Sequence, residues 1–236
     1  MTKKLLYRAS ENAIGSIETD NPIFGNLMVG AFGGSWRNSS PQEDKIFHID
    51  IFHRPPGSNY EYGIDIKTEA RIRRSEERTN PDFQWIQVTT KMGSPGALYG
   101  KADYFGFINS KGNLLTPMKY VRKFYEEIVD KNEVTKHPMR ENVNYRRKYL
   151  NKNGEMVCPP EKSFLMRYID LKCLSDYRFD ENGKAIPLPA KQYGEKWVDF
   201  YISTIKEEFR KKSWGELDTL YDKPNDIYLK FKNNEI

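Results

Sequence analysis

Residues 47 to 67 read FHIDIFHRPPGSNYEYGIDIK, which is two short apolar runs separated by a segment rich in turn-forming residues. Alternating β-branched, aromatic and polar residues predict a strand on each side, and RPPGSN predicts the turn between them. One aspartate interrupts each run, Asp50 in the first and Asp65 in the second. Burying an unpaired carboxylate is costly, so these two positions indicate that a cation or another partner compensates the acids.

Strand geometry sharpens this expectation. Residues two apart share a face, so Asp65 and Lys67 project together on a wetted surface while Ile64 and Ile66 point into a core. Asp50 lies beside Asp65 if the hairpin register permits. Two neighbouring carboxylates repel each other unless a cation lies between them, and Mg²⁺ prefers oxygen ligands. The pattern therefore predicts a magnesium site on the hairpin.

The rest of the chain predicts an α+β protein whose sheet is mixed and mostly antiparallel, flanked by helices. Glycines and polar residues in FGNLMVGAFGGSWRNSSPQED favour a loop. The periodicity predicts helices over 4–17, 116–132 and 194–212, and consecutive strands over 45–52, 62–74, 84–90 and 103–110. We expect a core over residues 1–135, with a basic segment and a helical C-terminal extension over 136–236 packed on it.

Composition restricts the class of protein. With 38% hydrophobic and 14% aromatic residues, the 236-residue chain is expected to fold. Its two cysteines form no Cys-x-x-Cys pair, which argues against a zinc ribbon or a disulfide framework. We see neither a signal peptide nor a membrane span, and Lys and Asn usage resembles an AT-rich genome. We therefore expect no membrane partner and a location in the cytoplasm of a bacterium or a phage-infected cell.

Positive charge is concentrated in one segment. Residues 111–152 contain 11 basic and 5 acidic side chains, whereas the chain as a whole has a net charge of +5. A polyanion would be attracted first to this segment, and Tyr145 and Tyr149 among its cations suit contacts with a nucleic-acid backbone. A solvated helix face or loose surface segment would have the same composition.

The aspartates and the lysine also carry a resemblance to a known family. Asp50, followed after fifteen residues by Asp65-Ile66-Lys67, resembles the PD-(D/E)xK nuclease motif. The stretch QWIQVTTKMGSPGALYGKADYFGFI is similar to the segment that follows the motif in phage and restriction-type members, where Gln87 matches a position that helps bind metal. The likeness covers about residues 1 to 130. It departs from the family in lacking a proline before Asp50 and in having Asp instead of Glu at position 65.

This resemblance implies a restriction-endonuclease-like core and a Mg²⁺-dependent deoxyribonuclease, most simply an endonuclease, in which Mn²⁺ can substitute for Mg²⁺. Asp50, Asp65 and the Ile66 backbone carbonyl would bind the metal, with Glu11 as a further candidate. Lys67 would serve the attacking water or the phosphate, assisted by Gln87. The implied partner is DNA, and a homodimer is open. The candidate DNA contacts are Arg71, Arg73, Lys91, Lys101, Arg140, Arg146, Arg147 and Lys148.

Several alternatives remain open from the sequence. The same fold could be a nucleic-acid or protein binding module without turnover, or a phage structural or host-takeover protein. His48, Asp50 and His53 could bind a transition metal, although alternation puts His53 on the opposite face. A second Asp-x-Lys, YIDLK at 168–172, lacks the flanking pattern of the first.

Overall fold

A computed structural model describes most of the chain, namely residues 20–69, 80–90, 94–129, 141–144, 149–150, 153, 156–157, 161–211 and 224–234. The helix expected over 4–17 lies outside these residues. Within them, no helix combines the length and the apolar character that crossing a membrane requires.

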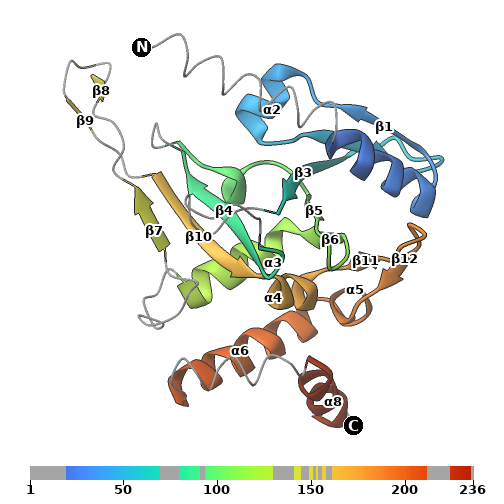
Figure 1. Ribbon diagram of the computed structural model, residues 1–236, viewed down its shortest axis with the longest axis vertical. Coiled ribbons are helices and arrows are strands. Elements are labelled where there is room, and N and C mark those ends of the chain that lie inside the picture. The colour runs from blue at the N-terminus through green and yellow to red at the C-terminus, as the bar shows by residue number, and fades with distance from the viewer. Residues whose placement is uncertain are drawn as a thin grey trace.

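The central feature is a seven-stranded sheet in the order β1-β2-β3-β5-β6-β11-β12 (Figure 1). Neighbours β3 and β5 are parallel, and the other neighbouring pairs are antiparallel. The sheet is therefore mixed and mostly antiparallel, as expected. Its strands are β1 Ser35–Asn38, β2 Ile51–Arg54, β3 Tyr62–Thr68, β5 Tyr104–Ile108, β6 Leu114–Pro117, β11 Tyr177–Phe179 and β12 Ala185–Pro187.

A second, three-stranded sheet has the order β4-β10-β7, and β8 pairs with β9 alone. The strand expected at 84–90 therefore exists, as β4, but it does not continue the first sheet. The segment after residue 136, expected to be basic and helical, also contributes β7 and β10 to the second sheet and β11 and β12 to the first. The bounds are β4 Phe83–Thr89, β7 Glu141–Asn144, β8 Tyr149–Leu150, β9 Met156–Val157 and β10 Glu161–Arg167.

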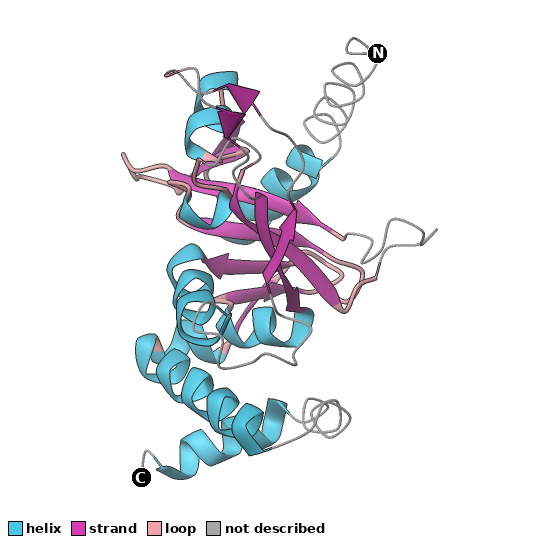
Figure 2. Cartoon of the chain, turned by 90° about the vertical axis from the view of Figure 1, so that its left-hand side faces the viewer, coloured by secondary structure: helices cyan, strands magenta, loops and turns pink. Residues whose placement is uncertain are grey.

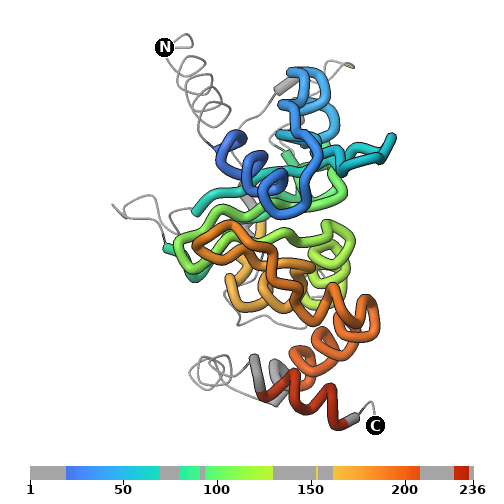
Figure 3. The backbone as a smooth tube through the Cα atoms, turned by 90° about the vertical axis from the view of Figure 1, so that its right-hand side faces the viewer, coloured from blue at the N-terminus to red at the C-terminus, as the bar shows by residue number. Residues whose placement is uncertain are grey.

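Helices lie at both ends of the molecule (Figures 2 and 3). Residues 20–32 are helical, and with α2 they lie at the end opposite α6 and α8. The remaining helical segments are α2 Pro41–Phe47, η1 Ala97–Tyr99, α3 Met118–Phe124, η2 Tyr125–Val129, α4 Tyr168–Leu174, α5 Pro189–Tyr193, α6 Glu195–Lys211 and α8 Pro224–Asn234. The helix expected over 194–212 is thus present as α6.

Two sequence-based expectations about residues 20–50 were wrong. The glycine-rich stretch expected as a loop is helical to residue 32, and Gly25 permits the helix to approach β1, since a Cβ there would lie 2.3 Å from the Trp36 ring. The strand expected from residue 45 begins only at Ile51. Before it, Ser40 and Glu43 form a capping box that starts α2.

The main sheet separates two apolar clusters. Strand alternation places Ile64 of β3 on one face, where it packs in a cluster with Phe24 of helix 20–32. On the other face Phe105 and Phe107 of β5 join the larger cluster, which includes Ile86 of the second sheet. Asp65 is the Cα partner of Phe105, so Asp65 and Lys67 lie on the side of this larger cluster.

A buried ion pair links the end of β10 to α4, and a tyrosine of α6 bonds to it. The Arg167 guanidinium donates two hydrogen bonds to the Asp170 carboxylate, at 2.7 and 2.6 Å, and the Tyr201 hydroxyl donates a third at 2.7 Å. All three residues are buried. Asp170 belongs to the second Asp-x-Lys sequence, YIDLK, which is helical and has a packing role.

Replacing Asp170 with alanine is expected to lower the free energy of unfolding by about 3 kcal/mol or more, because the buried Arg167 guanidinium loses its carboxylate. Urea denaturation measures this change. The matched control is Asp199→Ala, which removes an exposed carboxylate paired with Lys123 and should cost under about 1 kcal/mol. Equal costs for the two variants would contradict a structural role for the buried pair.

Candidate metal centre

Asp50 is positioned where β2 separates from β3. Its N–H donates to the Ile64 carbonyl at 2.9 Å, and its own carbonyl accepts from the Ser39 N–H at 2.9 Å. One residue beyond the last strand pair, its carboxylate Oδ2 accepts from the Ile66 N–H at 2.6 Å. The side chain of Asp50 thus takes the place of a strand partner for the Ile66 N–H, and this bond holds the carboxylate at the edge of β3.

Asp65 and Lys67 share one face of β3, as predicted. The Lys67 ammonium forms an ion pair with Asp65 Oδ1. Asp65 is only 2% exposed, whereas the Lys67 side chain is 24% exposed. The face is therefore less wetted than expected, because only the lysine of the pair reaches solvent. Ile64 and Ile66 are buried on the opposite face, as the alternation predicts.

The second oxygen of Asp65 has no donor. Asp65 Oδ2 is buried and accepts no hydrogen bond from the residues that the structure describes. Burial raises the pKa of Asp65 to about 7; the Lys67 charge opposes this rise, and the neighbouring Asp50 carboxylate adds to it. The two carboxyls are therefore near neighbours, and a proton or a cation between them would relieve their repulsion.

A third acid, Asp44 on α2, acts electrostatically on Asp50 and Lys67. Burial lowers the pKa of Lys67, but the carboxylates of Asp65, Asp50 and Asp44 raise it by more, so Lys67 stays charged. Burial and the neighbouring Asp50 charge raise the pKa of Asp44. Asp44 was not predicted from the sequence, because its stretch was assigned partly to a loop and partly to a strand. The capping pattern Ser40 to Glu43 was the available signal for the helix that carries it.

The Ile66 carbonyl points toward the same edge. Backbone groups of successive strand residues alternate between the two neighbouring strands. The Gly63 carbonyl faces β5, where it accepts from the Asp103 N–H, and the Ile64 carbonyl faces β2, where it accepts from the Asp50 N–H. Alternation therefore directs the Ile66 carbonyl to the Asp50 side. This agrees with its expected role beside the two carboxylates.

These groups fit a hard divalent cation. Two carboxylates and a carbonyl at one strand edge are oxygen ligands of the type that Mg²⁺ prefers, with water in its other positions. Within the described ranges, no group of three or more His, Cys, Asp or Glu side chains is arranged to hold a metal ion. The ligand set at this strand edge contains two such side chains, Asp50 and Asp65, and its third oxygen comes from the backbone.

The other predicted site residues lie on other elements or cannot be placed. Gln87 lies half-buried on β4 of the second sheet, on the face opposite the buried Ile86 and Val88. Lys101 is exposed, with its ammonium 4.6 Å from the centre of the Phe47 ring. The predictions for the following residues concern positions outside the described ranges: Glu11, Arg71, Arg73, Lys91, Arg140, Arg146, Arg147 and Lys148.

The histidines occupy separate surroundings. His48 ends α2 in a left-handed conformation, and its Nε2 lies 3.1 Å from the Pro95 carbonyl. His53 is buried, with Nε2 2.9 Å from the Gly33 carbonyl. The Nε2 atom of each histidine is thus directed at a different backbone carbonyl, which does not favour the transition-metal interpretation.

Comparison with known proteins identifies no relative. No family model, no curated protein and no solved structure matches the chain. Any assignment of function therefore rests on the residues themselves.

Proposed function

We propose that this protein is a Mg²⁺-dependent deoxyribonuclease of the PD-(D/E)xK type, with a restriction-endonuclease-like core. One observation carries the proposal: Asp65 Oδ2 is buried, has no donor among the residues that the structure describes, and lies beside the Asp50 carboxyl and next to an ammonium on the same strand face. The order of the three groups along the chain is that of the nuclease motif. The arrangement is costly for a structural role and useful for a catalytic one.

The cost is the reason for assigning function. A buried carboxylate oxygen without a hydrogen bond costs roughly 1 to 3 kcal/mol, and two adjacent negative charges add repulsion. If position 65 served only the core, an apolar side chain of similar size would avoid this cost. A divalent cation removes both costs at once, because both carboxylates become its ligands. Ionisable groups whose pKa is strongly shifted by burial and by a neighbouring charge are concentrated at functional sites.

The protein groups have distinct tasks in hydrolysis. Asp50, Asp65 and the Ile66 carbonyl would hold Mg²⁺. When bound, Mg²⁺ would make the attacking water more acidic and stabilise charge on the phosphate. The Lys67 ammonium, one strand position beyond Asp65 on the same face, orients the water or pairs with a phosphate oxygen. Its partial exposure leaves it accessible to a substrate.

Replacing Lys67 with methionine separates cation binding from cleavage. The variant is expected to cut DNA at least about a hundredfold more slowly, because it lacks the ammonium at the phosphate. Its affinity for Mn²⁺ should be retained or increased, since Lys67 no longer competes for Asp65 Oδ1. Calorimetric Mn²⁺ titration and a cleavage assay measure the two effects. Full cleavage by Lys67→Met would remove the lysine from the mechanism.

The function is tested by incubating the protein with supercoiled plasmid in Mg²⁺, Mn²⁺ or EDTA. Metal-dependent nicking or linearisation is the expected result, and the ratio of nicked to linear product reports whether one strand or both are cut. DNA binding that EDTA leaves unchanged, without cutting, would support the non-catalytic binding module. If the protein neither cuts nor binds DNA, both interpretations are contradicted, and a phage structural or host-takeover protein is the interpretation that is left.

A further inference from the structure

Helix α2 carries Asp44 and contributes no fully buried side chain. Phe47 at its C-terminal end packs against the larger apolar cluster, so it is the N-terminal end of α2 that depends on polar contacts for its position. At its N-terminal end, the Ser40 side chain accepts from the Glu43 N–H, and the Glu43 carboxylate accepts from the Ser40 N–H at 2.7 Å. At its C-terminal end, His48 leads directly into Ile49 and Asp50. A contact that fixes Glu43 therefore also helps to fix Asp50, which directly precedes β2.

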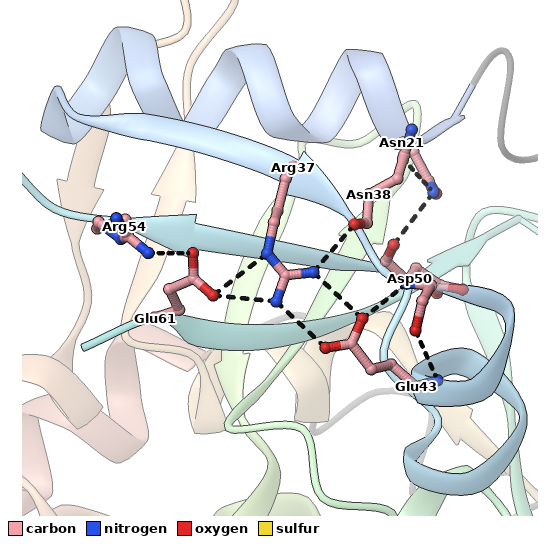
Figure 4. Close-up of polar contacts among 8 residues, drawn as sticks. Asn21, Arg37, Asn38, Glu43, Asp50, Arg54 and Glu61 are labelled. Atoms are coloured by element: carbon pink, nitrogen blue, oxygen red, sulfur yellow. Dashed lines mark hydrogen bonds and ion pairs between the residues drawn. The ribbon is translucent and has the colours of Figure 1, made fainter. Parts of the chain in front are cut away.

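Arg37 of β1 holds Glu43 (Figure 4). Its Nη1 and Nη2 donate to the Glu43 carboxylate, each at 3.2 Å. Its Nε and Nη2 donate to Glu61 at 3.2 and 3.0 Å, and Nη1 also donates to the Asn38 carbonyl. These contacts match the five N–H donors of a guanidinium. The guanidinium also lies 4.0 Å above the centre of the Phe52 ring.

The residues that follow Arg37 contact Asp50 itself. The Ser39 N–H donates to the Asp50 carbonyl at 2.9 Å. The buried Asn21 amide donates to the same carbonyl at 3.3 Å and to Asn38 Oδ1 at 3.0 Å, as Figure 4 shows. One short stretch of chain, residues 37–40, thus holds the start of α2 and the backbone of Asp50 together.

We infer that Arg37 is a positioning residue for the metal centre, fixing α2 and the 37–40 stretch so that the Asp50 carboxylate is held beside Asp65. This inference rests on the proposed function for its cation, but its structural part stands separately. Arginine suits the role because its rigid, planar guanidinium directs two N–H groups at Glu43 and two at Glu61 in fixed directions, whereas an ammonium is a compact point charge. Hydrogen bonding to Arg37 lowers the pKa of Glu43 to about 2, so the contact persists at every pH where the enzyme would act.

The chain offers a matched control in Arg54. Arg54 of β2 pairs with the same Glu61 carboxylate at 2.9 Å and is similarly exposed. In the described part of the chain, its ion pair is with Glu61 and not with an acid of α2. Arg37→Gln and Arg54→Gln therefore each remove one cation and its bonding to Glu61, but only the first removes the bonds to Glu43.

The test combines two measurements on the full chain, hydrogen exchange of backbone amides and Mn²⁺ affinity by calorimetry. In Arg37→Gln, the Ile66 amide, which donates to the Asp50 carboxylate, should exchange roughly tenfold faster. The Asp103 amide, bonded to Gly63 on the other side of β3, should be unchanged. Mn²⁺ affinity should fall by roughly tenfold, as for other residues that orient metal ligands. Arg54→Gln should change neither quantity.

Glu43→Gln should reproduce the effects of Arg37→Gln, and the double variant should be no worse than either single one, because both changes break the same contact. Arg37→Lys serves if Arg37→Gln does not fold. Unchanged Ile66 exchange in the Arg37 variant, or an equal change in the Arg54 variant, overturns the inference, as does unchanged Mn²⁺ affinity. If the wild-type chain binds no Mn²⁺, the proposed function fails, and the exchange comparison alone decides the role of Arg37.

Discussion

The Asp65→Asn substitution is expected to slow Mg²⁺-dependent DNA cleavage by about a thousandfold or more. The amide has nearly the shape of the carboxylate but supplies no negative charge, so cation affinity falls together with the rate. The structure adds a second expectation. Asp65 Oδ2 is buried, accepts no hydrogen bond from the described part of the chain, and is adjacent to Asp50. Removing its charge should therefore not destabilise the metal-free protein near pH 8. Loss of cleavage and retained stability should therefore occur together.

The matched control for this variant is Asp82→Asn. Asp82 also forms an ion pair with a lysine, Lys111, but its side chain is 57% exposed. This substitution should leave both cleavage and stability nearly unchanged, because an exposed pair contributes little. Metal-dependent cleavage that survives in Asp65→Asn, or one that is lost equally in Asp82→Asn, would rule out the proposed role of Asp65.

The stability of the metal-free protein is expected to decrease as the pH rises toward neutrality. Burial, together with the Asp50 charge, raises the pKa of Asp65 from an ordinary value of 3.8 to about 7. A raised carboxyl pKa means that the folded state binds the proton more tightly than the unfolded state does. The stabilisation is complete below pH 3.8 and is lost as the pH passes through about 7. The expected loss is roughly 2 to 4 kcal/mol.

Urea denaturation in EDTA measures this loss as the difference in stability between wild type and Asp65→Asn. The measurements run from about pH 4 to about pH 8, which covers the interval between the ordinary pKa of 3.8 and the raised pKa of about 7. The difference should shift in favour of the variant as the pH increases. Adding Mg²⁺ at pH 8 should restore the stability of the wild type only, because a ligand that binds the folded state stabilises it. Parallel pH profiles for the two proteins would show that Asp65 is not the group with the raised pKa.

The local geometry of the hairpin could be predicted from the sequence. Alternation has a period of two, so a correct strand assignment alone places Asp65 with Lys67 and buries Ile64 and Ile66. The ion pair and the burial confirm this. The proximity of Asp50 followed from the turn that joins the two strands. These features depend on neighbours in the chain, which is why the sequence reveals them.

Other features depend on contacts that are distant in sequence. The parallel pairing of β3 with β5 requires β4 to leave the main sheet and pair with β10, about 75 residues later. Helix 20–32 contains glycines that usually indicate a loop, yet Gly25 lets this helix pack closely against the Trp36 ring of β1. Gly106 of β5 likewise leaves room for the ring of Phe24, which the helix carries. Asp44 is brought near Asp50 and Lys67 by α2, a helix that the sequence analysis did not predict. Local propensity could not show these tertiary contacts.

The central claim is that Asp50 and Asp65 share one divalent cation. Anomalous diffraction from a crystal soaked in Mn²⁺ tests it directly, because manganese scatters anomalously and protein oxygen does not. We expect a peak about 2.2 Å from an oxygen of each carboxylate, with the Ile66 carbonyl as a third ligand. A saturated crystal with no peak between the two carboxylates, or with manganese bound only elsewhere, would contradict it.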